Sequence, residues 1–346
     1  MGTAFIMDIA LITPAPRFSR RGNRVTAARW AHILRELGHR VSIQEEYTGG
    51  HCDLMVALHA QRSHPSMRRY RESRPDAPLV LTLTGTDLHG DIHVHREAQE
   101  SLEMADWIIV LHGLGAEELP GHLRPKVRVI VQSVSLPPRL PRPSPDGFRV
   151  CVLGHLRPVK DPFRAARAAR LLGPGSRIRI LHLGAALTPE MEAEAREEAA
   201  SNPRYKWMGD LPHWKVLQIL AGSRLHVLSS KMEGGANALC EAIACSVPTL
   251  ASRIPGSVGI LGRDYPGYFP LEDTGALASM LERAETDAPF YRDLRERCIR
   301  LKPLVEPARE RRCWEELLGE VFPDRAKAAR GGASSPKVLA LEKPRP

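Results

Sequence analysis

The sequence contains few aromatic residues, no CxxC motif and no long apolar run, and each shortage excludes a class of protein. Phe, Trp and Tyr make up 5% of the 346 residues, which argues against an aromatic surface for stacking nucleic-acid bases. The six cysteines are scattered, so a disulfide scaffold or a four-cysteine zinc site is not expected, and a reducing cytoplasm fits. The apolar runs have the length of strands, far below the ~20 residues of a membrane-spanning helix.

Positive charge is in excess, and much of it lies near the C-terminal end. The formal net charge is +9, and residues 325–346 contribute six Lys or Arg and one Glu. The Pro, Gly and Ser content of this stretch is typical of disordered chain, so residues 323–346 are predicted to be a basic disordered tail. A solubilising extension is the simpler interpretation, and weak contact with nucleic acid or membrane is the alternative.

Strand-like apolar runs alternate with helical segments along most of the chain, which indicates an α/β fold with parallel sheets covered by helices. The first run contains Asp8 and lacks a basic leader, so it is interpreted as a strand rather than a signal peptide. In the first half, a helix is predicted at 22–37 and strands at 5–12, 40–43, 53–59, 79–83, 107–111 and 127–131. In the second half, strands are predicted at 148–154, 178–184, 206–211, 224–230 and 248–252, and helices at 161–172, 189–201, 213–221, 237–245, 276–285 and 289–319.

A proline-rich segment divides the chain. Residues 136–147 contain five prolines, which cannot donate to a sheet ladder and which stiffen a connection. We therefore expect one domain over residues 1–136 and a second over 148–322, joined by a linker at 137–147, with the last helices able to pack back on the first domain. Because open parallel sheets bind ligands beyond the carboxyl ends of their strands, the active site is predicted in a cleft between the domains.

The segment from residue 224 to residue 250 carries the strongest motif. A strand leads into a loop with Glu233 and two glycines, and a helix begins near Asn237. Glycines let the backbone approach a ligand closely, and the free N–H groups at a helix start favour a diphosphate. Glu241 is placed to accept hydrogen bonds from ribose hydroxyls and Glu233 from sugar hydroxyls, so the pattern suits a nucleotide diphosphate sugar. A glycine-rich turn before a capped helix with solvated glutamates is the weaker alternative.

This segment resembles glycosyltransferase family four, whose members have the GT-B fold of two facing Rossmann-like domains. The resemblance implies that Glu233 approaches the donor sugar, that Glu241 holds the nucleotide ribose, and that the backbone between them meets the phosphates. The positions that it implies for the donor are Glu233, Gly234, Gly235, Ala236, Asn237 and Glu241. Cys245 and Ser246 stand where the family commonly has glycine, which favours the left-handed turn ending a helix, so a strained or differently shaped exit is expected.

A second motif, GHLRPVKDP at residues 154–162, follows a predicted strand and supports the same resemblance. Family members use an arginine and a lysine here on the donor diphosphate, which makes Gly154, Arg157 and Lys160 donor-binding candidates. Arg157 and Lys160 are also candidate catalytic residues together with Glu233, because cleavage of the glycosyl–phosphate bond leaves growing negative charge to be stabilised. Two solvated basic residues in a loop are the alternative.

The loops that end strands of the first domain carry basic and polar residues suited to a small anionic acceptor. Any single arginine there is equally well interpreted as a solvated surface residue. The acceptor-binding candidates are Arg20, Arg21, Asn23, Arg24, Thr26, His59, Arg62, Ser63, Thr84, Gly85, Thr86 and Asp87.

Six patches narrow the resemblance to a subfamily. GNRVTAARWA, LHAQRS, LTGTDLHGDI, GHLRPVKDPFRAA, MEGGAN and ASRIPGSVGILGRDYPGYFP are similar to the selenosugar synthases of selenoneine biosynthesis. The resemblance implies transfer of a sugar from UDP-N-acetylglucosamine or UDP-glucose to selenophosphate, which forms a C–Se bond and a 1-selenosugar for a downstream selenoneine enzyme. Selenium in selenophosphate is already anionic, so this nucleophile needs little help from a general base.

Two other interpretations stay open: a family-four hexosyltransferase acting on a carbohydrate or a small thiol, and a non-catalytic basic protein that binds nucleic acid. Residues 87–95 (DLHGDIHVH) alternate acidic residues and histidines, but we interpret them as a loop entering a helix rather than a metal site. No metal or other cofactor is expected, because GT-B enzymes use basic residues and helix dipoles instead. Core or interface positions are predicted for Trp30, Trp107, Trp207, Trp214 and Trp314.

Overall fold

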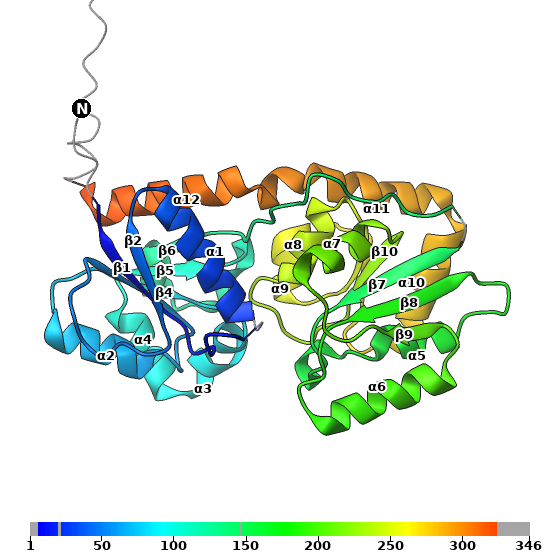
Figure 1. Cartoon of the computed structure of the whole chain (residues 1–346), viewed down its shortest axis with the longest axis horizontal. Helices are drawn as coiled ribbons and strands as arrows, with labels where there is room; N and C mark the ends of the chain where they lie inside the picture. Colours follow the sequence, from blue (N-terminus) through cyan, green and yellow to red (C-terminus); the bar gives the residue numbers. More distant parts are fainter. Residues whose placement is uncertain (1–5, 20–21, 146, 324–346) are drawn as a thin grey trace, which may run out of the picture.

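The computed structural model describes residues 6–19, 22–145 and 147–323, and its strands form two six-stranded sheets (Figure 1). The first sheet has the order β2-β1-β3-β4-β5-β6 and the second the order β12-β11-β10-β7-β8-β9. The strand pairs of both sheets are parallel. The predicted α/β fold with two parallel sheets is therefore confirmed.

The N-terminal half, up to residue 136, is built on the first sheet. Its strands are β1 (Asp8–Ile12), β2 (Arg40–Gln44), β3 (Leu54–Leu58), β4 (Leu79–Thr82), β5 (Trp107–Val110) and β6 (Val127–Val129). Its helices are α1 (Gly22–Glu36), α2 (His64–Ser73), α3 (Ile92–Val94) and α4 (Arg96–Met104), with a π-helical turn η1 (Asp87–Asp91) and 3₁₀ turns η2 (Gly113–Glu118) and η3 (Gly121–Lys126).

The C-terminal half, from residue 148 onward, is built on the second sheet. Its strands are β7 (Phe148–Leu153), β8 (Ile178–Leu183), β9 (Tyr205–Trp207), β10 (Leu225–Leu228), β11 (Thr249–Ser252) and β12 (Tyr268–Phe269). Its helices are α5 (Arg164–Arg170), α6 (Pro189–Ser201), α7 (His213–Ala221), α8 (Asn237–Ala244), α9 (Pro255–Leu261), α10 (Thr274–Thr286), α11 (Ala288–Arg300) and α12 (Pro307–Val321), with 3₁₀ turns η4 (Pro158–Lys160) and η5 (Lys302–Val305). Of the predicted basic tail, residues 324–346 lie outside the described residues.

Burial along the strands explains their order in the first sheet. β3 and β4 are buried along their whole length, and Thr82 at the end of β4 is their one polar residue, as expected for central strands of a sheet covered on both faces. β2 is polar and partly exposed, and it lies at the sheet edge. The helix predicted at 22–37 is α1, which buries Trp30 and Leu34 against one face of the sheet.

The last two helices differ from the single helical stretch predicted at 289–319. α11 ends at Arg300, and α12 begins at Pro307 after the short turn η5. Pro303 and Pro307 cause this interruption, because proline removes a helical hydrogen bond and clashes with the preceding turn. The short elements β12, α2 and α9 were not predicted either.

Helix α12 packs on the N-terminal half although it follows the C-terminal half in sequence (Figure 1). Trp314 of α12 is fully buried and meets Trp30 of α1 edge to face, with ring centroids 4.9 Å apart. The segment after β6 runs beside this crossing, where Val134 N donates to Val305 O at 3.0 Å. Two covalent connections thus link the halves on the same side of the molecule.

Within the described part of the chain, no helix combines the length and the apolar character that a bilayer crossing requires.

Candidate functional site

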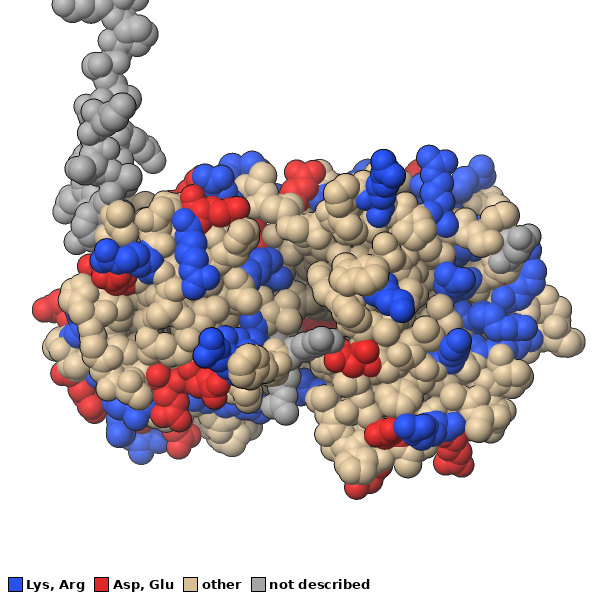
Figure 2. All heavy atoms as spheres, in the orientation of Figure 1, with Lys and Arg blue, Asp and Glu red and all other residues tan. Residues whose placement is uncertain are grey.

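The loops after β4 and β10 meet between the two halves, where Figure 2 shows a notch in the molecular surface. A Cβ added at Gly234 would lie 2.4 Å from Gly85 N, and one added at Gly85, whose φ is +137°, would lie 2.8 Å from Gly234 N. Glycine is therefore required at both positions for the two backbones to come this close. The sequence predicted that glycines here let the backbone approach a ligand closely. In the structure, Gly85 and Gly234 let the backbones of the two halves approach each other closely.

Glu233 lies at the centre of this junction and is only 7% exposed. Its Oε1 atom accepts hydrogen bonds from Lys160 Nζ at 2.5 Å and from Ser230 Oγ at 2.5 Å. Its main-chain oxygen accepts a hydrogen bond from His89 Nε2 of the N-terminal half at 3.0 Å. The structure thus brings together two predicted site residues, Glu233 and Lys160, from segments 73 residues apart.

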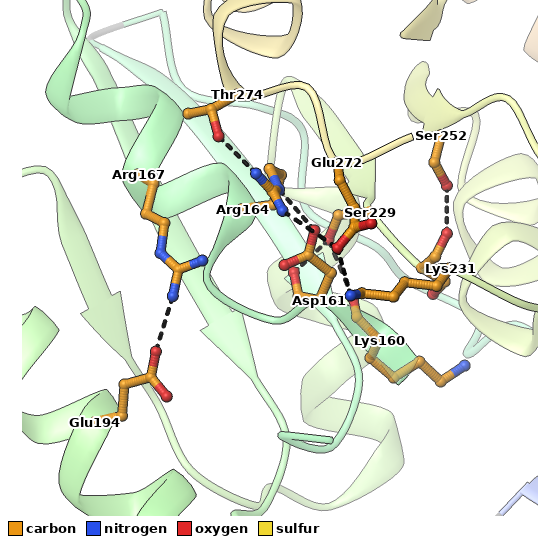
Figure 3. Close-up of polar contacts among 11 residues, drawn as sticks. Lys160, Asp161, Arg164, Arg167, Glu194, Ser229, Lys231, Ser252, Glu272 and Thr274 are labelled. Carbon is orange, nitrogen blue, oxygen red and sulfur yellow. Dashed lines mark hydrogen bonds and ion pairs between the residues drawn. The ribbon is translucent and has the colours of Figure 1, made fainter. Parts of the chain in front are cut away.

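Lys160 stands at the end of η4, in the loop that follows β7 (Figure 3). Asp161 follows with φ +44° and accepts a hydrogen bond from Arg164 Nε at 2.6 Å. Arg164 Nη1 also donates to Thr274 Oγ1 at 2.7 Å, and the Lys160 side chain extends away from this network toward Glu233. The buried Asp161–Arg164 pair fixes the turn that presents Lys160.

Gly154 and Arg157 precede Lys160 in the same loop. Gly154 adopts φ +154°, and its main-chain oxygen accepts a hydrogen bond from buried His182 Nε2 at 3.1 Å. Burial in the core lowers the pKa of His182 to about 4, so this imidazole is a neutral donor at physiological pH. Arg157 is the residue before η4 and is partly exposed. These contacts fix the backbone of the loop independently of any ligand.

Helix α8 begins directly after the two glycines. Ala236 precedes it in an extended conformation, so the first N–H groups of the helix have no intrahelical partner. Asn237 Oδ1 accepts a hydrogen bond from Arg29 Nη1 of the N-terminal half at 3.3 Å. One turn later, Glu241 Oε1 accepts a hydrogen bond from His213 Nε2 at 2.9 Å, and this contact raises the pKa of His213 above its usual value. The helix start therefore places main-chain N–H groups one turn before a carboxylate held by a titratable partner.

The end of α8 shows the departure that the sequence suggested. Ser246 adopts φ +58°, in the left-handed region, and Val247 N donates to Ala242 O at 2.9 Å. A non-glycine residue in this conformation carries backbone strain.

Asp87, predicted to help shape the acceptor site, lies beneath the loops rather than on their surface. Its carboxylate is fully buried and accepts hydrogen bonds from Thr84 N at 2.8 Å, Gly85 N at 2.9 Å and Ala60 N at 2.9 Å. These bonds tie the loop after β3 to the loop after β4. Asp87 thus shapes the junction from inside the protein.

His59 is the most unusual residue of the N-terminal loops. It adopts φ +81° and is buried, and its Nε2 lies 3.2 Å from Thr86 Oγ1 and 3.6 Å from Asp91 Oδ2. Its Nδ1 accepts a long hydrogen bond from Arg62 N at 3.4 Å. Strained residues of this kind persist where surrounding contacts hold them, often beside functional sites.

The other acceptor candidates do not gather at one place. Thr26 is buried and accepts a hydrogen bond from Gln132 Nε2 at 3.0 Å, and Ser63 donates to Leu58 O at 2.7 Å. Arg24 lines a surface pocket of about 320 Å³ with Arg17, Arg35, Ile43 and Glu45, against the edge strand β2. Arg62 is exposed and Asn23 is partly exposed. Arg20 and Arg21 lie outside the described residues.

The histidine-rich stretch 87–95 is not a strand, because it forms the turn η1 and the short helix α3. Across the described ranges, the one group with metal-ligand spacing is Asp8, His51 and Asp53. Asp8 there is held by Arg40 through two hydrogen bonds of 2.6 and 2.7 Å. That group lies at the opposite ends of the strands from Glu233, since Asp8 begins β1.

Trp214 contradicts the prediction of a core or interface position, because it is 57% exposed. It occupies the first turn of α7, directly after His213. The apolar face of this short helix is instead formed by Leu217 and Leu220, which leaves Trp214 on the solvent side.

A second contact between the halves joins η2 to α9. A Cβ added at Gly259 of α9 would lie 2.2 Å from Nδ1 of buried His112, and Arg263 Nη2 lies 3.5 Å from Glu117 Oε1. The His112 ring stacks on His89 with centroids 5.9 Å apart. Burial is the main cause that lowers the pKa of His112 to about 4. The residue that donates to Glu233 O thus rests on a neutral imidazole.

Several residues of this site were not predicted, namely Arg29, His213, Ser230 and Glu310. Arg29, His213 and Glu310 lie 28 to 281 residues from their partners, so no local spacing signals these three. The SSK tripeptide after β10 is the one local signal, since it places Ser230 three residues before Glu233.

One family model matches most of the C-terminal half. Residues 141–300 match the family model described as Glycosyl transferases group 1. No curated protein sequence matches the chain significantly. The matched stretch includes Lys160, Glu233 and Glu241.

Solved structures match nearly the whole chain. A sucrose-phosphate synthase from Thermosynechococcus elongatus has a TM-score of 0.71 at 17% identity, and the match covers 92% of this chain and 99% of that one. HepE of Anabaena in complex with UDP has a TM-score of 0.73 at 14% identity, covering 91% and 100%. The complex of HepE with UDP-glucose has a TM-score of 0.71 at 15% identity, with the same coverage. Identities this low establish the fold, which is GT-B.

Proposed function

We propose that this protein, whose C-terminal half matches the group 1 glycosyl transferase model and whose fold is GT-B, transfers a sugar from a UDP-sugar to a small anionic acceptor. The observation that carries the proposal is the pairing of Lys160 with Glu233 beside the start of α8. A cation, a carboxylate and free helix N–H groups are the three kinds of group that a sugar diphosphate needs. HepE, a structure of the same fold, binds UDP and UDP-glucose.

The donor would lie along the segment from Glu233 to Glu241. Its diphosphate would accept hydrogen bonds from the N–H groups near Asn237, and its ribose hydroxyls would donate to Glu241. Lys160 already bonds Glu233, so a bound diphosphate would draw the ammonium group toward itself. That movement would release Glu233 Oε1 to accept a hydrogen bond from a sugar hydroxyl.

The departing group determines which residues assist the reaction. The bond between the anomeric carbon and the diphosphate oxygen breaks, and UDP leaves with the electron pair. Lys160 and Arg157 would stabilise this charge in the transition state. Glu233 would orient the sugar ring, because its buried position fixes the carboxylate.

We propose selenophosphate as the acceptor, on the similarity of the six sequence patches to selenosugar synthases. The selenium atom attacks the anomeric carbon and forms a C–Se bond as UDP departs. Water then cleaves the Se–P bond, which releases phosphate and leaves a 1-selenosugar for a downstream enzyme of selenoneine biosynthesis. Exposed Arg62 and partly exposed Thr86, in the loops after β3 and β4, are the acceptor candidates that stay accessible there, and buried His59 contacts both of them.

The test is a direct assay with purified protein, UDP-N-acetylglucosamine or UDP-glucose, and selenophosphate. We expect UDP release and a selenium-containing sugar by mass spectrometry. Lys160→Met should reduce UDP release at least about a hundredfold, as removal of a group that stabilises the transition state does. Lys231→Met is the matched control, because Lys231 pairs with exposed Glu272 on the neighbouring loop, and its activity should be unchanged.

Two outcomes would overturn parts of this proposal. Transfer to a carbohydrate or a small thiol with no selenium product would keep the UDP-sugar transferase and replace its acceptor. No UDP release with any acceptor would overturn the transferase itself.

A further inference from the structure

Arg29 lies in the middle of α1 and reaches across to the C-terminal half. Its Nη1 atom donates to Asn237 Oδ1 at 3.3 Å, and Asn237 is the first residue of α8. Its Nε atom lies 3.2 and 3.1 Å from the two carboxylate oxygens of Glu310 in α12. The guanidinium group therefore bridges the last helix of the chain and the helix that would hold the diphosphate.

Glu310 is a rigid anchor for this arginine. The carboxylate is 1% exposed and accepts hydrogen bonds from Trp30 Nε1 at 2.6 Å, Ser133 N at 2.9 Å and Ser133 Oγ at 2.5 Å. Four donors on two oxygens leave it no other orientation. Because a guanidinium is planar, an anchored Nε also fixes the directions of both terminal nitrogens.

One side-chain nitrogen of Arg29 has no hydrogen-bond partner among the described residues. The Nη2 atom is inaccessible to solvent and makes no hydrogen bond with the described residues. A buried, unpaired N–H of a charged group is costly, and an anionic oxygen near the start of α8 would remove that cost. The positive charge of Arg29 also acts on His213, the partner of Glu241, because it opposes protonation of that imidazole and so acts to lower its pKa.

We propose that Arg29 is a positioning residue for the nucleotide diphosphate, held by Glu310 and acting through Asn237. The N-terminal half, expected to serve the acceptor, thereby also orders the start of the donor-binding helix. This inference rests on the proposed UDP-sugar site. It differs from a purely structural role because it predicts an effect specific to ligands that carry phosphate.

The experiment compares the binding of UDP and of uridine by calorimetry in the full-length protein. Arg29→Met should weaken UDP binding at least about tenfold and leave uridine binding within about twofold, because the diphosphate alone lies at the helix start. Arg35→Met is the matched control: Arg35 lies on the same helix and donates to Val41 O on its exposed side, so both affinities should be unchanged.

Asn237→Ala is the second variant, since it keeps the Arg29–Glu310 pair intact and should weaken UDP binding in the same selective way. Unchanged UDP affinity in Arg29→Met, or in Asn237→Ala if Arg29→Met does not fold, would overturn this inference and leave the proposed function standing. An equal loss for UDP and uridine would also overturn it, because that pattern indicates a general structural defect. Absence of UDP binding by the wild-type protein would overturn the proposed function and this inference with it.

Discussion

Replacing Glu310 by alanine should destabilise the protein more than any surface substitution on the same helix. The change removes a buried carboxylate that accepts hydrogen bonds from Trp30 Nε1, Ser133 N and Ser133 Oγ and that pairs with Arg29. The arginine would then be a largely buried charge without its counter-ion, since its side chain is 18% exposed.

The magnitude follows from this geometry. Breaking a buried ion pair by removing one partner costs about 3–5 kcal/mol. Each neutral donor left unpaired costs about 1–3 kcal/mol, although water entering the space left by the side chain recovers part of that loss. We therefore expect the free energy of unfolding to fall by about 3–5 kcal/mol, a large part of the about 5–15 kcal/mol typical of a folded domain.

Urea denaturation followed by tryptophan fluorescence measures this loss, because Trp30 and Trp314 lie in contact beside the site. Glu315→Ala is the matched control. Glu315 lies on the same helix and makes an exposed pair with Arg311, which contributes at most about 1 kcal/mol. A loss below about 1 kcal/mol for Glu310→Ala would refute the reasoning, since it would mean that Arg29 and the three other donors do not depend on this carboxylate.

Three further predictions concern the junction, a buried histidine and the ribose carboxylate. Gly234→Ala would place a methyl group 2.4 Å from Gly85 N and should lower kcat/KM for UDP-sugar at least about tenfold, whereas Gly121→Ala, which has open space around it, should not; equal activity of the two variants would contradict the close approach. Burial lowers the pKa of His226 to about 3. Below pH ~6.5 the His226 imidazole therefore binds a proton in the unfolded chain but stays neutral in the folded protein, so the free energy of unfolding falls as the pH falls. In urea denaturation, the wild-type protein should lose up to about 2 kcal/mol more than His226→Leu between pH 8 and pH 5, and an equal loss would refute this assignment. Because the hydrogen bond to Glu241 raises the pKa of His213, protonated His213 should compete with the ribose for the Glu241 carboxylate. UDP affinity measured by calorimetry should therefore rise from pH 6 to pH 8 in the wild-type protein and become independent of pH in His213→Ala. A wild-type affinity that does not change with pH would argue against this competition.

Local patterns predicted the sheets and the helix that follows Glu233. A buried strand, two glycines and a helix start lie within 20 residues of one another there, so hydrophobic periodicity and turn chemistry are enough to place them. The same patterns did not separate α11 from α12, because the apolar spacing continues across Pro303 and Pro307. In that stretch the backbone requirement of proline overrides the pattern.

The roles of individual polar residues were less accessible from the sequence. Asp87 was predicted to help shape the acceptor site, and the sequence did not indicate that backbone N–H groups from two loops would surround its carboxylate. Glu310 received no prediction, because its partners Trp30 and Ser133 are 280 and 177 residues away. A carboxylate in a helical segment is usually solvated, and only the packing of α12 on α1 buries this one.

A crystal structure with UDP bound tests the account at its centre. We predict the diphosphate at the main-chain N–H groups near Asn237, the ribose hydroxyls at Glu241, and Lys160 turned from Glu233 toward the phosphates. Density for UDP away from α8 would contradict the account. So would a crystal soaked with saturating UDP that shows no nucleotide density beside α8 and the Lys160–Glu233 pair.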